Sequence, residues 1–136
     1  MAEFSVDSSV IIAIHKRERG FEIFSSALLS GYWCIGFPTI LEIRIWETRN
    51  NDGRHLPTLD AMFADPTISQ SPFDANLEPF ASAAYARFGK GRHAAKLNYG
   101  DCMAYAVAKS LDVPLLFKGA DFGLTDVKCH PASIVS

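Results

Sequence analysis

Cysteines are few in this 136-residue sequence, and long apolar runs are absent from it. The three cysteines, Cys34, Cys102 and Cys129, are odd in number and form no C-x-x-C pair, which argues against a disulfide framework and against a zinc site. Residues 10–14 form an apolar stretch far too short to span a bilayer, and no basic lead precedes an apolar segment near the N-terminus. We therefore expect a cytoplasmic protein without a membrane anchor.

Polar, Gln-rich and Pro-rich tracts are also missing, and no internal repeat or linker stands out. The composition, 49% hydrophobic and 21% charged, is that of an ordinary globular protein rather than a disordered one. A chain of this length buries a sizeable core without help from disulfides or a structural metal. We predict a single domain over residues 1–136.

The chain lacks the strong positive charge of most static nucleic-acid binders, because its formal net charge is −2. Cations gather in one segment, residues 87–96, in which two glycines loosen the backbone. Two interpretations fit this segment: a solvated loop, or a loop that contacts phosphate groups. Its basic residues are Arg87, Lys90, Arg92, His93 and Lys96.

Several common catalytic motifs are absent as well. There is no G-x-S-x-G elbow and no G-x-x-x-x-G-K-[ST] loop, and the stretch of residues 89–91 does not follow a strand as a dinucleotide fingerprint requires. The four histidines are scattered, without the spacing of a triad or of a metal pair. His93 alone, inside the basic segment, is placed where it could meet a substrate.

Short apolar segments alternate with helical patterns along the chain. Strands are expected at residues 4–6, 33–36, 67–71 and 114–117, with an edge strand at 134–135. Helices are expected from a cap at residues 7–9 to residue 19, where Gly20 would supply a left-handed cap, and then at 21–29, from residue 37, and at 56–64, 74–88 and 101–111. Short, uniformly apolar strands between helices indicate a parallel sheet covered on both faces, so we predict a three-layer α/β domain.

Four acidic residues occupy positions that such a sheet would bring together. Asp7 and Asp121 follow strands, Asp101 begins a helix, and Glu42 lies about one turn into another helix. In a parallel sheet the carboxyl ends of the strands and the starts of the following helices share one crevice. Each acid also has a simpler interpretation: Asp7 as a helix cap, Asp101 as a first-turn acid, Asp121 as a turn residue and Glu42 on a solvated face.

Taken together, the four acids point to a metal site. Carboxylates crowded into one crevice repel one another and raise each other's pKa values, and a divalent cation relieves that repulsion. Ligands that are all oxygen favour Mg²⁺ or Mn²⁺ over Zn²⁺. Such an ion activates water and stabilises charge on a phosphoryl group, which is the chemistry of phosphodiester hydrolysis.

The sequence resembles a PIN-domain ribonuclease of the VapC toxin type. The resemblance rests on FSVDSSVIIAI at the start, FPTILEI around Glu42, RFGKGRHAAKLNYGDCMAYAVAK around Asp101 and LLFKGADFGLTDV around Asp121. It implies four or five parallel strands flanked by helices and cleavage of RNA that depends on Mg²⁺ or Mn²⁺. By position, Asp7, Glu42 and Asp101 match the central acids of the family, Asp121 matches a less constant fourth acid, and Ser9 matches a small hydroxyl residue.

One departure from the family pattern concerns the fourth acid. Ala120 stands where close relatives often carry a further acidic residue. Two alternatives remain if that acid was the ligand: Asp121 acts through water, or Asp126 replaces it. The same departure, with the slight excess of acidic residues in the chain, motivates a rival hypothesis, a PIN-like binding or scaffold module that has lost catalysis. A phosphatase acting on small phosphoesters is a third hypothesis.

The resemblance also implies partners. A VapB-type antitoxin would place an Arg or Lys from its C-terminal tail among the carboxylates, which is physically reasonable because a cation can replace the charge of the metal. Phe24, Leu28, Ile45 and Trp46 would form either a groove for this antitoxin or part of the core. A homodimer is expected from the resemblance alone, and transfer RNA is the substrate class that it suggests first.

Overall fold

A computed structural model describes residues 1–135, so the last residue of the predicted 1–136 domain lies outside the described residues. The strands are β1 (Phe4–Val6), β2 (Trp33–Gly36), β3 (Ser69–Ser71) and β4 (Leu115–Leu116). The helices are α1 (Ser8–Lys16), α2 (Phe21–Ser30), α3 (Phe37–Asn51), α4 (Leu56–Phe63), α5 (Glu78–Phe88) and α6 (Tyr99–Leu111), followed by a short 3₁₀ helix, η1 (Phe122–Leu124).

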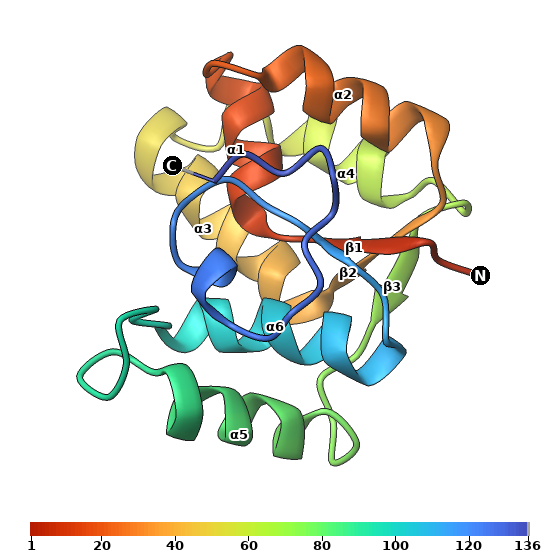
Figure 1. The fold of residues 1–136 in the computed structure, drawn as a ribbon. Coiled ribbons are helices and arrows are strands. Elements are labelled where there is room, and N and C mark those ends of the chain that lie inside the picture. Colours follow the sequence, from red (N-terminus) through yellow and green to blue (C-terminus); the bar gives the residue numbers. More distant parts are fainter. Residues whose placement is uncertain (136) are drawn as a thin grey trace.

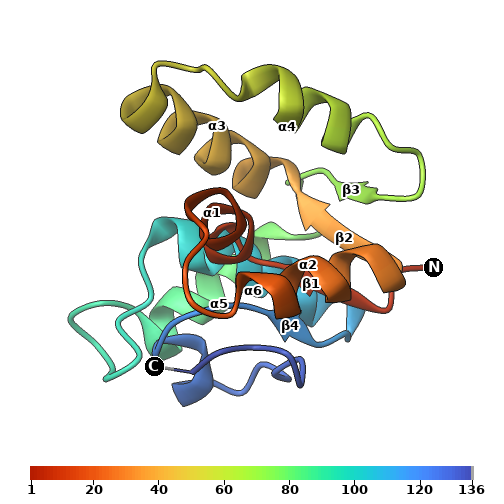
Figure 2. The same cartoon turned by 90° about the horizontal axis from the view of Figure 1, so that it is seen from above.

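The four strands form one parallel sheet in the order β3-β2-β1-β4. Cys34 of β2 pairs with Ser5 of β1 on one side and with Ser69 of β3 on the other. Figure 1 shows α5 and α6 on one side of the sheet and α1 and α2 on the other, and Figure 2 shows α3 and α4 continuing the second layer. The three-layer α/β fold expected from the sequence is therefore confirmed.

Two buried clusters fill the spaces on the two faces of the sheet. On one face, α6 packs against β1 and β2 and is itself covered by α5, and its side of the core includes Phe88, Tyr105 and Phe117. On the other face, Phe24 and Ile43 belong to the cluster that joins β1 and β2 to the first four helices. The buried strands β1, β2 and β4 are mainly apolar, as expected for strands covered on both faces, whereas the edge strand β3, Ser-Gln-Ser, is polar and partly exposed.

Some element boundaries differ from those expected. The left-handed residue that ends α1 is Arg17, with φ 53°, whereas Gly20, with φ 90°, precedes α2. Helix α5 begins at Glu78 rather than at residue 74, since a turn at Asp74 precedes it. The expected strand at 134–135 is reduced to an isolated bridge between Lys118 and Ile134.

No helix within residues 1–135 has the length and apolar character needed to cross a membrane. The mean hydropathy of the sequence, +0.08, is close to zero, and the apolar residues of the longest helix, α3, are divided between the core and the surface. Ile40 and Ile43 are buried, whereas Leu41 and Ile45 are exposed on the same helix. Those exposed side chains lie beside the candidate site described next.

Candidate active site

The four predicted acids line a single cleft of about 460 Å³ at the carboxyl edge of the sheet. Asp7 follows β1, Glu42 lies in the second turn of α3, Asp101 lies in the first turn of α6, and Asp121 immediately precedes η1. The structure thus brings together carboxylates from four separate elements. The rest of the lining consists of Ser8, Ser9, Ile12, Glu18, Asn98, Lys118, Gly119 and Phe122.

Asp7 is a helix cap as well as a wall of the cleft. Its carboxylate accepts a hydrogen bond of 3.1 Å from the backbone N–H of Ser9, which fixes the side chain at the start of α1. The residue is only 5% exposed. Burial raises the pKa of Asp7, the hydrogen bonds to Ser9 and Ser8 oppose that rise, and the charge of Asp121 adds to it.

Asp101 likewise both stabilises the start of a helix and lines the cleft. In a reciprocal capping box, Asp101 N–H donates to Oδ1 of Asn98 at 2.8 Å, and its carboxylate accepts from the Asn98 N–H at 3.0 Å. Helix α6 therefore starts at Tyr99, two residues before the expected start. Burial raises the pKa of Asp101 to about 7 against the backbone hydrogen bond, and the charges of Asp7, Asp121 and Glu42 contribute to the rise.

Glu42 faces the cleft and is half buried. Burial raises its pKa, a contact with the Ser8 hydroxyl lowers it, and the charge of Asp7 raises it further. The simple interpretation of Glu42 as a residue on a solvated outer face therefore does not describe its position. Asp7, Glu42 and Asp101 each have a raised pKa in the cleft, mainly because they are buried and further because they lie near other carboxylates.

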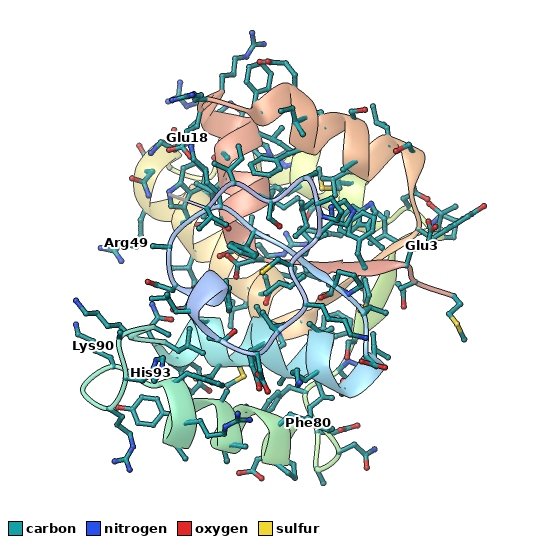
Figure 3. All side chains as sticks on the ribbon, in the orientation of Figure 1. Glu3, Glu18, Arg49, Phe80, Lys90 and His93 are labelled. Atoms are coloured by element: carbon teal, nitrogen blue, oxygen red, sulfur yellow. The ribbon has the colours of Figure 1, made fainter. Side chains whose placement is uncertain are left out.

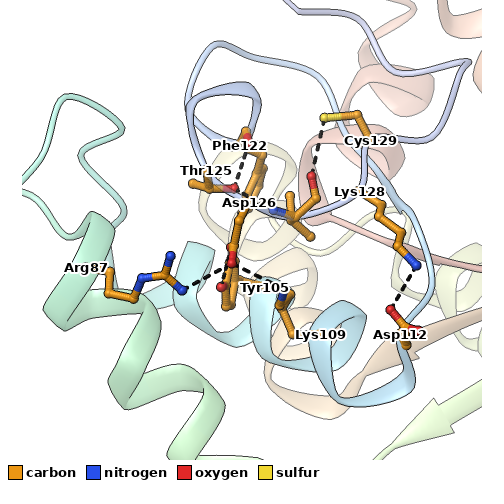
Figure 4. A network of polar contacts seen from close by, with 10 residues as sticks. Arg87, Tyr105, Lys109, Asp112, Phe122, Thr125, Asp126, Lys128 and Cys129 are labelled. Atoms are coloured by element: carbon orange, nitrogen blue, oxygen red, sulfur yellow. Dashed lines mark hydrogen bonds and ion pairs between the residues drawn. The ribbon is translucent and has the colours of Figure 1, made fainter.

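Asp126, the alternative fourth acid, belongs to a different network. Its carboxylate accepts hydrogen bonds from the Tyr105 hydroxyl at 2.6 Å, from Arg87 at 3.1 Å and from Lys109 at 3.3 Å (Figure 4). These contacts join α5 and α6 to the segment after η1. Asp121 lines the acidic cleft and Asp126 does not, so the geometry favours Asp121 as the fourth member.

The basic segment does not line the cleft. Arg87 is paired with Asp126, and Nε of Arg92 donates to the carbonyl of Ala86 at 3.1 Å. His93 packs edge-on against Phe88. Figure 3 shows Lys90 and His93 on the loop between α5 and α6. Of the predicted substrate-binding residues, Ser9 lines the cleft, and Arg87, Lys90, Arg92, His93 and Lys96 do not.

Seven residues of the cleft lining were not predicted as site residues from the sequence, and three of them, Asn98, Lys118 and Glu18, affect its hydrogen bonds and charge. Asn98 had a local signal, because Asn-x-x-Asp before an apolar helix is a capping pattern. Lys118 and Glu18 had none, since 100 positions separate them in the chain, yet they form an ion pair of 3.3 Å. Only the folded chain reveals that a cation lines the acidic cleft.

The donor chemistry of the cleft suits a hard divalent cation. All four acids offer carboxylate oxygens, and neither His nor Cys belongs to the lining. Within residues 1–135, however, no three His, Cys, Asp or Glu side chains stand close enough together to form a ready-made metal site. Burial is the main cause of the raised pKa values of Asp7, Glu42 and Asp101, and the charges of neighbouring carboxylates add to it. A bound divalent cation would favour the ionised form of all three.

Comparisons with known proteins agree with this fold. A family model described as the PIN domain matches residues 5–128. A protein named Ribonuclease VapC from Mycolicibacterium smegmatis is 36% identical over 129 residues, with 90% of this chain and 95% of the relative covered. Ribonuclease VapC36 from Mycobacterium tuberculosis is also 36% identical over 129 residues, with 90% of each chain covered.

Solved structures show the same fold at lower identity. The crystal structure of VapC20 from Mycobacterium tuberculosis, described as a sarcin-ricin loop cleaving toxin, matches with a TM-score of 0.74 at 14% identity, covering 91% of this chain and 95% of the other. DNA-bound VapBC from Salmonella typhimurium matches with a TM-score of 0.64 at 17% identity, covering 100% and 98%. The chain belongs to the PIN-domain family, among its VapC-type members.

Proposed function

We propose that the protein is an endoribonuclease toxin that depends on Mg²⁺ or Mn²⁺ and cleaves RNA in the acidic cleft. The observation that carries this proposal is the convergence of Asp7, Glu42, Asp101 and Asp121, from four elements, on the carboxyl edge of the sheet. The names of the VapC ribonuclease relatives support it. Its place of action would be the cytoplasm, where RNA substrates are found.

Each acid has a role in this proposal. Asp7, Asp101 and Asp121 would hold the ion directly and Glu42 through a water molecule. A bound divalent cation supplies an activated water and stabilises charge on the phosphoryl group. The two helix caps keep Asp7 and Asp101 in place, so these carboxylates need little rearrangement to meet a substrate.

The identity of the RNA is a separate part of the proposal. Specificity in single-stranded and looped RNA comes from the shape of the groove and from contacts to splayed bases, which follow no simple residue code. Transfer RNA is the class to test first. The ribosomal sarcin-ricin loop, named in the description of VapC20, is the second. Sequencing the ends of cellular RNA after brief induction would identify the cleaved bond.

We also propose a VapB-type antitoxin as the partner, since the neighbouring structures include toxin–antitoxin complexes. A groove of about 550 Å³ adjoins the acidic cleft and shares Glu42 with it. Its exposed apolar side chains include Phe37, Leu41 and Ile45. An apolar helix of the antitoxin would lie in this groove, and a cation from its tail would reach the acids.

The groove differs in part from the one expected. Phe24 is fully buried in the core, and Leu28 packs partly buried against the same cluster, so neither lines the groove beside the acids. Ile45 does line it, and the half-buried Trp46 does not. A homodimer stays a prediction from the family resemblance.

The rival hypothesis is a PIN-like scaffold module with weak or absent catalysis. Ala120 in place of an acid favours it, as does the lack of a ready-made three-ligand group within the described part of the chain. Titration calorimetry with Mg²⁺ and Mn²⁺ separates the two. An endoribonuclease shows an ion site in the wild type that Asp7→Asn or Asp101→Asn weakens, whereas a scaffold shows none.

Cleavage assays complete the test. Incubation with RNA and with a chromogenic phosphoester distinguishes a ribonuclease from a phosphatase. Cleavage of RNA that EDTA abolishes and added Mg²⁺ or Mn²⁺ restores would support the proposal. Ion binding without cleavage of cellular RNA would count against it.

A further inference from the structure

Lys118 is the one basic side chain that lines the acidic cleft within residues 1–135. It follows β4 at the carboxyl edge of the sheet, close in the chain to Asp121. Its side chain is 23% exposed, so the ammonium group is neither enclosed in the core nor freely solvated. A cation in a cleft lined by five acidic residues, Glu18 included, needs a physical explanation.

The backbone of Lys118 is held in place by the fold. Its N–H donates to Oγ of Ser9 at 3.0 Å, which ties it to the first turn of α1, directly after Asp7. The neighbouring Gly119 N–H donates to the carbonyl of Ile134 at 2.9 Å, and Lys118 bridges to the same residue. The start of the Lys118 side chain is thus fixed relative to the acids, and only its flexible stem can move.

In the structure, the Lys118 ammonium group pairs with Glu18, Nζ to Oε1, at 3.3 Å. Glu18 has a second cation, because Lys16 Nζ lies 3.3 Å from its other oxygen, Oε2. Lys118 can therefore leave Glu18 without leaving that carboxylate unpaired. A partly exposed ion pair of this kind contributes little to stability, so a purely structural role explains little.

The positive charge of Lys118 suits it to contact a nucleic acid. Carboxylates repel the phosphate groups of an entering strand, and the other basic candidates, such as Lys90 and His93, lie on a loop well separated from Glu18 (Figure 3). Lys118 can offer three N–H donors to a phosphate from within the cleft itself. No other Lys or Arg of the described chain lines the cleft.

We infer that Lys118 binds a backbone phosphate of the RNA strand in the acidic cleft, and that Glu18 holds the ammonium group until the strand enters. The inference rests on the proposed ribonuclease function and adds a substrate contact to it. Binding exchanges one ion pair, Lys118 with Glu18, for another, Lys118 with phosphate, while Glu18 keeps Lys16. The ligand is the phosphodiester group, so the contact is independent of base sequence.

The test measures RNA affinity without cleavage. A fluorescently labelled single-stranded RNA is titrated with Asp101→Asn protein in Mg²⁺ at several salt concentrations, and the same is done after adding Lys118→Gln. Loss of one phosphate contact should weaken binding roughly 10-fold at low salt and reduce the slope of log affinity against log salt by about 0.7. Adding Lys118→Arg in place of Lys118→Gln should preserve the slope.

Two further variants separate a phosphate contact from a structural ion pair. Lys128→Gln removes a lysine from an exposed pair with Asp112, at 2.9 Å and outside the cleft, and should leave the slope unchanged. Glu18→Gln breaks the same pair as Lys118→Gln but keeps the lysine, so RNA affinity should be maintained or increased. Equal losses in Lys118→Gln and Glu18→Gln would overturn the inference.

The outcomes also distinguish this inference from the proposed function. If the Asp101→Asn protein binds RNA and Lys118→Gln leaves its salt slope unchanged, the lysine contact is wrong and the ribonuclease proposal stands. If the Asp101→Asn protein binds no RNA and the wild type does not cleave it, both fail. A folded state is verified for each variant by its thermal melt, so a loss of binding cannot come from unfolding.

Discussion

Gly100 lies directly against the carboxylate of Glu42. A side-chain carbon built on Gly100 would overlap Oε2 of Glu42 and lie 3.0 Å from its Cδ atom. Gly100 lies in the first turn of α6, and its backbone is helical. Glycine at this position therefore makes room for the Glu42 carboxylate and is not needed for an unusual φ angle. Helices α3 and α6, which meet at the cleft, are thus closely packed at this one position.

Gly100→Ala tests that fit. The added methyl group should push Glu42 out of its position, weaken Mg²⁺ binding and lower RNA cleavage, although Ala is the better helix former by about 1 kcal/mol. The matched control is the same substitution in Glu42→Ala protein, where the obstacle is gone and Gly100→Ala should raise the melting temperature. Unchanged ion affinity in the Gly100→Ala single variant would contradict the role assigned to this contact.

Asp101→Asn should separate stability from activity. The amide keeps an oxygen that can accept the Asn98 N–H, so the capping box survives, and a repelling charge leaves the cluster. We expect the metal-free melting temperature to stay the same or rise by a few degrees, and RNA cleavage to fall by orders of magnitude. Asp101→Ala is the comparison that also removes the cap, and it should melt lower. A strongly destabilised Asp101→Asn that still cuts RNA would mark the acid as structural.

The acidic cluster should make the metal-free protein less stable as pH rises. The pKa of Asp101 is raised from 3.8 to about 7, so between these values the unfolded chain has lost a proton that the folded chain keeps. The free energy of unfolding therefore decreases as pH rises through this range. Below and above the range, Asp101 contributes little to its pH dependence. Thermal melts in EDTA from pH 4 to 8 should show this fall, and a smaller one in Asp101→Asn. Identical pH profiles would show that Asp101 does not titrate in this way.

The identity of the fourth acid can be tested by a pair of variants. Asp121→Asn should lower ion affinity and RNA cleavage, since Asp121 lines the cleft. Asp126→Asn should leave ion affinity unchanged but lower the melting temperature, because its carboxylate holds Tyr105, Arg87 and Lys109. The opposite pattern in calorimetry would assign Asp126 to the ion.

The basic segment makes its own prediction about RNA binding. Arg87 and Arg92 already have partners within the protein, so Lys90 and Lys96 are the better candidates for phosphate contacts. Replacing both by Gln should reduce the salt slope of RNA binding by roughly 1.4, which is two contacts at about 0.7 each. Lys96 has a left-handed backbone with a φ of 54°. Replacing its side chain by Gln adds no backbone strain beyond that already present with Lys. An unchanged slope would identify a solvated loop.

Much of the fold was predictable because its signals are local. Uniformly apolar segments indicated the buried strands, and Asp7 and Asp101 were recognisable beside helix starts. In a parallel sheet, strand direction alone then places Asp7 and Asp121 on one edge. The PIN-domain resemblance, which the comparisons confirm, fixed the family from quoted motifs spread over most of the chain.

The remaining features depend on tertiary contacts that no local pattern contains. Lys118 and Glu18 meet only after folding, and Gly100 is informative only once Glu42 is known to lie against it. Both interpretations of Asp101, the first-turn acid and the cleft acid, describe its position in the structure, so the sequence could not have chosen between them. The ion itself stays a prediction from the chemistry of the carboxylates.

The double duty of Asp7 and Asp101 constrains how this fold can evolve. Asp7 is the N-cap of α1, Asp101 closes the capping box of α6, and both line the cleft. Replacement by an aliphatic residue therefore removes a capping hydrogen bond worth about 1 kcal/mol together with a charge. A descendant that loses the chemistry but keeps the fold should therefore carry Asn, Ser or Thr at position 7 and Asn or Gln at position 101. Glu42 caps no helix, so substitutions there should be tolerated more readily. The residues found at the three sites in such a lineage would therefore show the order in which it lost its function.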